Sequence, residues 1–169
     1  PLLQRAEARG SDDGRVQAHL HALRANLAAN DYQIEAISTH ASHALDLLDE
    51  CESYTRAGAY RARAVAFDMA DDRSRAIEAY QRAIEVGRTA SYTHLQILAE
   101  TGRGMVLERN CAFSEAELSF REVLRLAGDP DQPVTCEAHA GLGRIAYARD
   151  DLRMAERHLA HGRDLARAI

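Results

Sequence analysis

The chain has 169 residues, of which 46% are hydrophobic, and a formal net charge of −5 at pH 7. This length and composition provide enough apolar surface for a folded core and exclude a disordered chain. Aromatic residues make up only 5% and tryptophan is absent, which favours closely packed helices over a sheet. Arginine and acidic residues alternate without forming a basic stripe, so direct nucleic-acid binding by this segment is not expected.

The sequence shows no signal peptide and no apolar run that approaches a membrane span, so no membrane partner is expected. Its three cysteines, Cys51, Cys111 and Cys136, are odd in number and far apart. Such cysteines are typical of reduced thiols and not of a disulfide framework, and we expect a cytoplasmic protein. Because the chain begins with Pro1 and ends at Ile169 without an obvious finish, we expect a fragment of a larger protein.

In chain order, a short helix is expected over residues 1–9, and similar apolar patterns then recur with a period of about 40 residues. The segments IEAISTHASHAL, SRAIEAYQRAI, SEAELSFREVL and MAERHLAHG place equivalent alanines at Ala36, Ala76, Ala116 and Ala155. In the first segment the apolar phase fits better from Ile37, so a slip of one residue is allowed there. We predict a single domain of four units, over residues 17–53, 54–91, 92–132 and 133–169.

Each unit is predicted to be a helix, a tight turn and a second helix. The turns fall at Asp71–Asp72, Asn110 and Asp150–Asp151. A short side-chain oxygen in each turn can accept a hydrogen bond from the free N–H groups that begin the second helix. Gly87 and Gly128 lie between units, where helix C-caps are expected.

Small residues recur where the two helices of a unit are expected to cross. They are Ala64, Gly104 and Gly143 in the first helices, and Ala76, Ala116 and Ala155 in the second helices. Four residues after each alanine of the second helices comes an aromatic residue or leucine, namely Tyr80, Phe120 and Leu159. We expect these larger side chains to fill the space between neighbouring helix pairs.

The types and order of these residues resemble a tetratricopeptide repeat (TPR), although the period is longer than the usual ~34 residues. Over residues 141–166 the chain resembles the sensor domain of MalT-type transcriptional activators of the LuxR family, and a weaker resemblance extends over about residues 18–167. The matching residues are Leu142, Gly143, Ile145, Tyr147, Asp151, Leu152, Ala155, His158 and Leu159. The resemblance implies an all-α fold, a right-handed superhelix of about four helix-turn-helix repeats.

In that family a nucleotide-binding signal-transduction ATPase precedes the repeat domain, and a DNA-binding helix-turn-helix follows it. The resemblance therefore implies a regulatory sensor domain that binds a small-molecule inducer or a partner domain in its concave groove. The first helices of the repeats line this groove in tetratricopeptide folds. The groove residues implied for this chain are Arg61, Asp68, Met69, Thr101, Glu108, Arg109, Arg144 and Tyr147.

Two other interpretations stay open. The same side chains can form an ordinary solvated face without a ligand. The domain can also be an interaction scaffold that docks a partner peptide, because related repeats occur in bacterial regulatory kinases. In either case, exposed apolar faces at the ends of the repeat array are expected to pair copies of the chain.

Cys136-x2-His139 and His158-x2-His161 offer four potential zinc ligands on helices that are expected to be antiparallel neighbours. However, both histidines of the second pair precede positions that we assign to the inside of the fold. They are therefore expected to point outward, and no metal site is predicted. No nucleophile lies in a strand–turn–helix elbow, so we predict no catalytic residue, no cofactor and no enzymatic activity.

Overall fold

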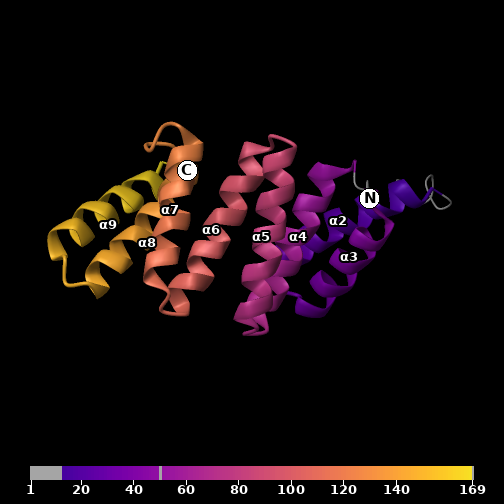
Figure 1. Cartoon of the computed structure of the whole chain (residues 1–169), viewed down its shortest axis with the longest axis horizontal. Helices are drawn as coiled ribbons and strands as arrows, with labels where there is room; N and C mark the ends of the chain where they lie inside the picture. The colour runs from indigo at the N-terminus through magenta and orange to yellow at the C-terminus, as the bar shows by residue number, and fades with distance from the viewer. Residues whose placement is uncertain (1–12, 50, 169) are drawn as a thin grey trace. The chain divides into compact units, whose positions relative to one another are not determined.

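The computed structural model describes residues 13–49 and 51–168, and these residues form helices without any strand. The predicted all-α fold is confirmed, whereas the helix expected over residues 1–9 lies outside the described residues. The helices are α2 (Gly14–Asn30), α3 (Ile34–Leu47), α4 (Ser53–Met69), α5 (Arg73–Thr89), α6 (Thr93–Arg109), α7 (Phe113–Ala127), the short 3-10 helix η1 (Pro133–Thr135), α8 (Cys136–Ala148) and α9 (Leu152–Ala166) (Figure 1).

The chain divides into two compact units, Pro1–Leu95 and Gln96–Ile169. In the first unit, α2 packs on α3 and α4 packs on α5, and both α2 and α3 contact α4 (Figure 1). In the second unit, α8 packs on α9 and α7 contacts α8. The Arg103 guanidinium of α6 donates a hydrogen bond to Ser119 Oγ of α7 at 3.0 Å. The helices therefore follow one another as antiparallel pairs, as the repeat predicts.

The same three-residue turn joins the two helices of every pair. Its middle residue has a positive φ between 56° and 63° in all four pairs, at Tyr32, Asp71, Cys111 and Asp150. The next backbone N–H donates to a carbonyl five residues earlier, as in Asp72 N to Phe67 O at 2.9 Å. Because these left-handed residues are spaced like the sequence repeat, they give an exact register for comparing the pairs.

Three of the predicted helix caps are confirmed and two are wrong. Asp72 and Asp151 cap the second helices α5 and α9 with their carboxylates. Asn110 does not cap α7, because the residue in the equivalent position is Ala112, which has no side-chain acceptor. Gly128 caps α7 with a φ of 75°. Gly87 instead lies inside α5, which continues to Thr89 and is capped by Ala90.

The register assigns the small residues that line the seam within each pair. Five residues after each left-handed residue come Ile37, Ala76, Ala116 and Ala155, all at most 3% exposed. The slip of one residue in the first segment is therefore confirmed, since Ile37 is fully buried and Ala36 is only half-buried. Phe120 is also fully buried, and its ring lies where a Cβ on Gly104 would come within 2.7 Å of it.

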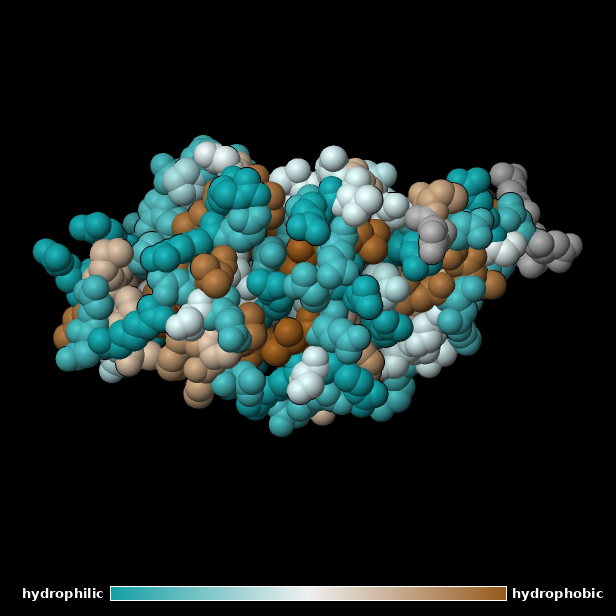
Figure 2. Space-filling model, in the orientation of Figure 1, coloured by the Kyte–Doolittle hydropathy of each residue, from teal (hydrophilic) through white to brown (hydrophobic). Residues whose placement is uncertain are grey.

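Alanine dominates the core of the first unit. One cluster of buried side chains joins α2, α3 and α4, and consists of Ala25, Ala28, Ile37, Ala41, Ala62 and Ala66. Such small side chains let the helix backbones approach closely. On the face shown in Figure 2, hydrophilic residues predominate and hydrophobic residues show between them in separate patches. Among the described residues, no helix combines the length and the hydropathy that crossing a bilayer requires.

Candidate functional site

In the first unit, the first helices of two successive pairs, α2 and α4, contact each other. The half-buried Arg61 of α4 donates a hydrogen bond to the side-chain oxygen of Asn26 of α2. Gly58, one turn before Arg61, leaves room for the Asn26 amide, which a Cβ on Gly58 would approach to 3.8 Å. This hydrogen bond therefore connects the faces of α2 and α4 that pack against each other.

A small apolar pocket of about 190 Å³ opens beside this contact. It is lined by His19, Ala22, Leu23, Asn26, Tyr54, Thr55 and Gly58. Leu23 is 56% exposed and Tyr54 is 57% exposed. The Tyr54 ring also packs edge-on against the Tyr92 ring, with centroids 5.2 Å apart. Large apolar side chains are thus available on this face of the first unit.

In the second unit, the corresponding first helices α6 and α8 are joined by an ion pair. Arg144 of α8 donates two hydrogen bonds to the Glu108 carboxylate of α6, at 2.6 and 2.8 Å. These bonds raise the pKa of the Arg144 guanidinium above its ordinary value. Tyr147 lies three residues further along α8 and is 67% exposed. A bidentate pair of this kind holds both side chains in one geometry.

All eight predicted groove residues lie on first helices, in α4, α6 or α8. The structure brings Glu108 and Arg144 into direct contact. Met69 instead packs partly against the alanine-rich cluster of the first unit, and the Thr101 hydroxyl donates to the Ile97 carbonyl of its own helix at 2.8 Å. That the eight residues together line one concave groove stays a prediction.

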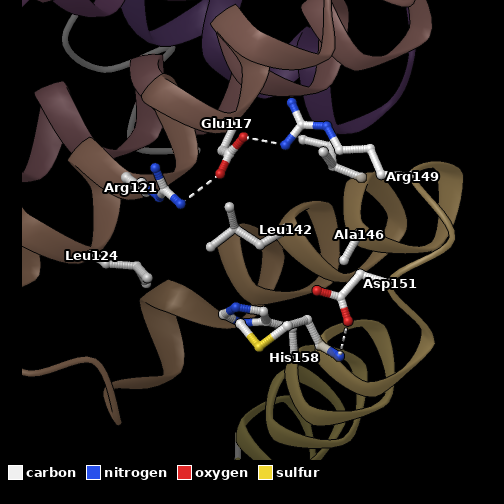
Figure 3. A pocket seen from close by; sticks show the side chains of 10 residues that line it. Glu117, Arg121, Leu124, Leu142, Ala146, Arg149, Asp151 and His158 are labelled. Carbon is white, nitrogen blue, oxygen red and sulfur yellow. Dashed lines mark hydrogen bonds and ion pairs between the residues drawn. The ribbon is translucent and has the colours of Figure 1, made fainter.

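Sequence reasoning missed a second hollow, a pocket of about 280 Å³ between α7, α8 and α9 (Figure 3). Its lining residues are Glu117, Arg121, Leu124, Leu142, Ile145, Ala146, Arg149, Asp151, Met154 and His158. In Figure 3, Arg121 and Arg149 approach the Glu117 carboxylate from opposite sides, at 2.6 and 2.5 Å. The spacing of Glu117 and Arg121 by four residues indicates their ion pair in the sequence. Arg149 belongs to the next repeat, so no local spacing indicates its contact with Glu117.

A buried polar cluster on α6 and α7 was also missed. The Glu100 carboxylate lies 3.4 Å from the Arg103 guanidinium, and Glu100 is only 6% exposed. Burial raises the pKa of Glu100 above its ordinary value, against the opposing effects of Arg103 and of a hydrogen bond with Ser119. This carboxylate occupies a position on the helix where an apolar residue would be the usual choice.

The histidines of α9 do not point outward, which corrects a prediction. His158 Nδ1 lies 3.0 Å from His139 Nδ1 of α8, and the ring centroids of His161 and His139 are 4.4 Å apart. The buried stripe of α9 runs through Ala155, Gly162 and Leu165, and His158 lies on the same side of the helix. Even so, no group of three or more potential ligands within residues 13–49 and 51–168 has the geometry of a metal site.

A comparison with known protein families identifies the family to which this helical repeat region belongs. A family model described as a MalT-like TPR region matches residues 18–169. The chain belongs to this family. The match spans all four helix pairs and agrees with the resemblance of residues 141–166. No curated protein sequence matches this MalT-like TPR region.

Two solved structures share the fold of the MalT-like TPR region. The apo form of RapI superposes with a TM-score of 0.85 at 15% sequence identity, over 98% of this chain and 62% of RapI. BtubC (BKLC) from P. vanneervenii superposes with a TM-score of 0.79 at 15% identity, over 99% of this chain and 70% of BtubC. At this identity the likeness concerns the helical repeat fold alone, and the chain spans less than two thirds of RapI.

Proposed function

We propose that this MalT-like TPR region is the regulatory sensor segment of a MalT-type transcriptional regulator of the LuxR family. Within it, the exposed faces of the first helices receive a segment of a partner protein or a neighbouring domain. The family match over residues 18–169 is the observation that carries this proposal. A cytoplasmic location fits the same proposal, because its regulatory output requires access to DNA.

The two pockets described above are smaller than a usual small-molecule site, which favours a protein segment at these two places. They measure about 190 and 280 Å³, below the roughly 300–1,000 Å³ that is usual for enclosed small-molecule sites. By contrast, Leu23, Tyr54 and Tyr147 are each more than half exposed. Leu23 and Tyr54 in the first unit, and Tyr147 beside the Glu108–Arg144 pair in the second unit, are each suited to the contact area of a peptide or domain.

Regulation adds a requirement to binding. A partner or inducer shifts the parent protein between closed and open states only if it binds the two states with different affinity. The alternative function is an interaction scaffold, for example the regulatory domain of a bacterial kinase, that docks a peptide on the same face without switching. The domains encoded beside this chain in its gene separate the two functions, since an ATPase and a helix-turn-helix belong only to the first.

The direct test is a calorimetric titration of the 169-residue chain with each domain encoded beside it. A positive result is saturable binding that Arg144→Glu weakens by at least tenfold, because reversing this charge breaks the pair with Glu108 and repels its carboxylate. Arg153→Glu is the matched control, since Arg153 is an exposed arginine on the second helix α9. If both variants lost the same amount of affinity, the first helices would not form the binding surface.

A thermal-shift screen of sugars and other small metabolites tests the inducer directly. A ligand present at about 100 times its Kd stabilises the folded form by about 2.7 kcal/mol, which raises the Tm measurably. If a metabolite raises the Tm and neither neighbouring domain binds, the ligand of this region is a small inducer and not a protein partner.

A further inference from the structure

The sequence contains two histidine triads with identical spacing. The N-terminal triad is His21, His40 and His43, and the C-terminal triad is His139, His158 and His161. In both, the second histidine follows the first by 19 residues and the third follows the second by three. The first member lies on the first helix of a pair and the other two lie one turn apart on the second helix, in α2–α3 and in α8–α9.

The two triads also have the same geometry. The Nδ1 atoms of the first two histidines are 3.0 Å apart in each triad. The third ring packs edge-on against the first, with interplanar angles of 84° in the N-terminal triad and 80° in the C-terminal triad. Each triad therefore connects the two helices of its own pair by one hydrogen bond and two ring contacts.

A hydrogen bond between two Nδ1 atoms requires that one ring carries the proton and the other does not. At each of the two Nδ1–Nδ1 contacts one neutral ring therefore donates its Nδ1–H and the other accepts, whichever ring is the donor. In the C-terminal triad this contact is largely shielded from solvent, because His139 is only 6% exposed.

The surroundings of the first two histidines of each triad oppose protonation, whereas His161 Nε2 lies 3.1 Å from the Asp131 carboxylate. Burial lowers the pKa of His139 most, followed by the neighbouring His161 and His158, while a hydrogen bond to the Pro130 carbonyl and the charge of Asp131 oppose this shift. Burial also lowers the pKa of His158, together with His161, Arg157 of α9 and Arg121 of α7.

The N-terminal triad follows the same pattern. Burial lowers the pKa of His21, and His43 adds to this shift. Burial likewise lowers the pKa of His40, together with His21, Arg24 of α2 and His43. Among the described residues, no carboxylate contributes to the pKa shifts of His21 and His40.

We propose that the two triads are proton-operated latches, which hold the α2–α3 and α8–α9 pairs closed when neutral and release them on acidification. Once both rings of a pair are protonated, two N–H donors and two positive charges face each other at a distance suited to a hydrogen bond. The hydrogen bond is then lost and the charges repel. The α4–α5 pair contains no histidine and has no latch.

The direction of the pH dependence follows from linkage. Because the folded-state pKa lies below the ordinary value, the unfolded chain binds more protons, and stability rises with pH in that range. The stabilisation is complete above the ordinary histidine pKa of about 6.5 and is lost as the pH falls below it. With four histidines acting together, we expect the Tm to fall by about 5 °C or more between about pH 7.5 and pH 5.5.

Hydrogen exchange on the 169-residue chain resolves which helices respond. After correction for intrinsic rates, the amides of α2–α3 and α8–α9 should lose protection on acidification, while those of α4–α5 should keep it. A uniform loss across all pairs would overturn the proposal. NMR titration of the imidazoles provides a measurement that needs no variant: a pKa at or above the ordinary value for both His40 and His158 would also overturn it.

The double variant H40Q/H158Q should flatten the pH dependence of the Tm, because glutamine keeps a polar group but does not titrate. H94Q is the control, since His94 is exposed on α6 and belongs to neither triad; it should retain the full dependence. Addition of ZnCl2 at neutral pH distinguishes a different role. A rise in Tm with zinc that H40Q/H158Q abolishes would assign the triads to metal binding and overturn the latch.

Discussion

Gly141 of α8 lies so close to Phe120 of α7 that a Cβ on Gly141 would come within 2.3 Å of the ring. A Cβ on Gly104 of α6 would come within 2.7 Å of the opposite edge of the same ring. The ring is fully buried and fills the volume that the two glycines leave. The seam between the third and fourth helix pairs therefore depends on the absence of two side chains.

Gly141→Ala should destabilise the chain by about 1–3 kcal/mol, because the added methyl group forces the Phe120 ring out of its position. Urea unfolding followed by circular dichroism measures this change. Gly58→Ala is the matched control, since its Cβ would meet only the Asn26 amide at 3.8 Å. Removing a helical glycine there should stabilise the chain by up to about 1 kcal/mol. Equal losses in both variants would contradict the role of the Phe120 contact.

The repeat itself could be predicted from the sequence because small residues are the most constrained feature of the seams. The period, the order of helices and turns, and the slip to Ile37 all follow from that pattern. The caps were less predictable. Asn110 has a suitable side chain, but the turn places Ala112 at the cap of α7, and one residue of register decides which side chain can reach the N–H groups.

Contacts between repeats could not be predicted in the same way. Arg149 and Glu117 lie in different helix pairs, and no local spacing relates them. The sequence predicts an outward His158 because its neighbour Leu159 is assigned to the inside, yet Leu159 is 40% exposed. Helical spacing gives the relative direction of side chains, but the packing partner decides which of two adjacent stripes is buried.

Cys111→Gly should stabilise the chain. Cys111 adopts a φ of 57° in the turn between α6 and α7, a conformation that costs L-residues about 1–2 kcal/mol and glycine almost nothing. Glycine loses more backbone entropy on folding, so a net gain of about 0.5–1 kcal/mol is expected. Chemical denaturation under reducing conditions measures it.

The control for this prediction is Cys136→Gly. Cys136 has a φ of −55° at the start of α8, so glycine relieves no strain there and its entropy cost should lower the stability. A gain at position 136 as large as that at position 111 would show that removal of a thiol, and not the turn conformation, is responsible.

Glu100→Gln should raise the Tm at neutral pH. The folded-state pKa of Glu100 lies above its ordinary value, chiefly because of burial. A group shifted in this direction favours folding only at low pH, and its contribution is lost as the pH rises through the folded pKa. Glutamine keeps the shape without the charge, so the gain should be largest near pH 7 and should shrink toward about pH 4.

Differential scanning calorimetry across this pH range measures the effect. Glu156→Gln, at an exposed position of α9, should change the free energy of unfolding by no more than about 0.5 kcal/mol, as ordinary surface substitutions do. If the gain from Glu100→Gln were independent of pH, the altered packing and not the buried charge would be its cause.

Leu159→Arg should reduce self-association of the chain. In the register of the turns, Leu159 occupies the position of Phe120, nine residues after the left-handed residue of its pair. Its side chain packs on Gly143 as Phe120 packs on Gly104. However, Phe120 is fully buried whereas Leu159 remains 40% exposed. The surface of Leu159 is therefore suited to another helix with a small residue, and a second copy of the chain can supply one.

Sedimentation velocity over a range of concentrations measures this association. The unmodified chain should show a concentration-dependent dimer that Leu159→Arg removes, because a charge at that position opposes burial of the face. Leu118→Arg is the control, since Leu118 is 64% exposed on α7 and lies outside the equivalent position. A dimer that both variants weaken equally would have its interface elsewhere, and a monomer at all concentrations would mean that the Leu159 face does not pair copies of this chain.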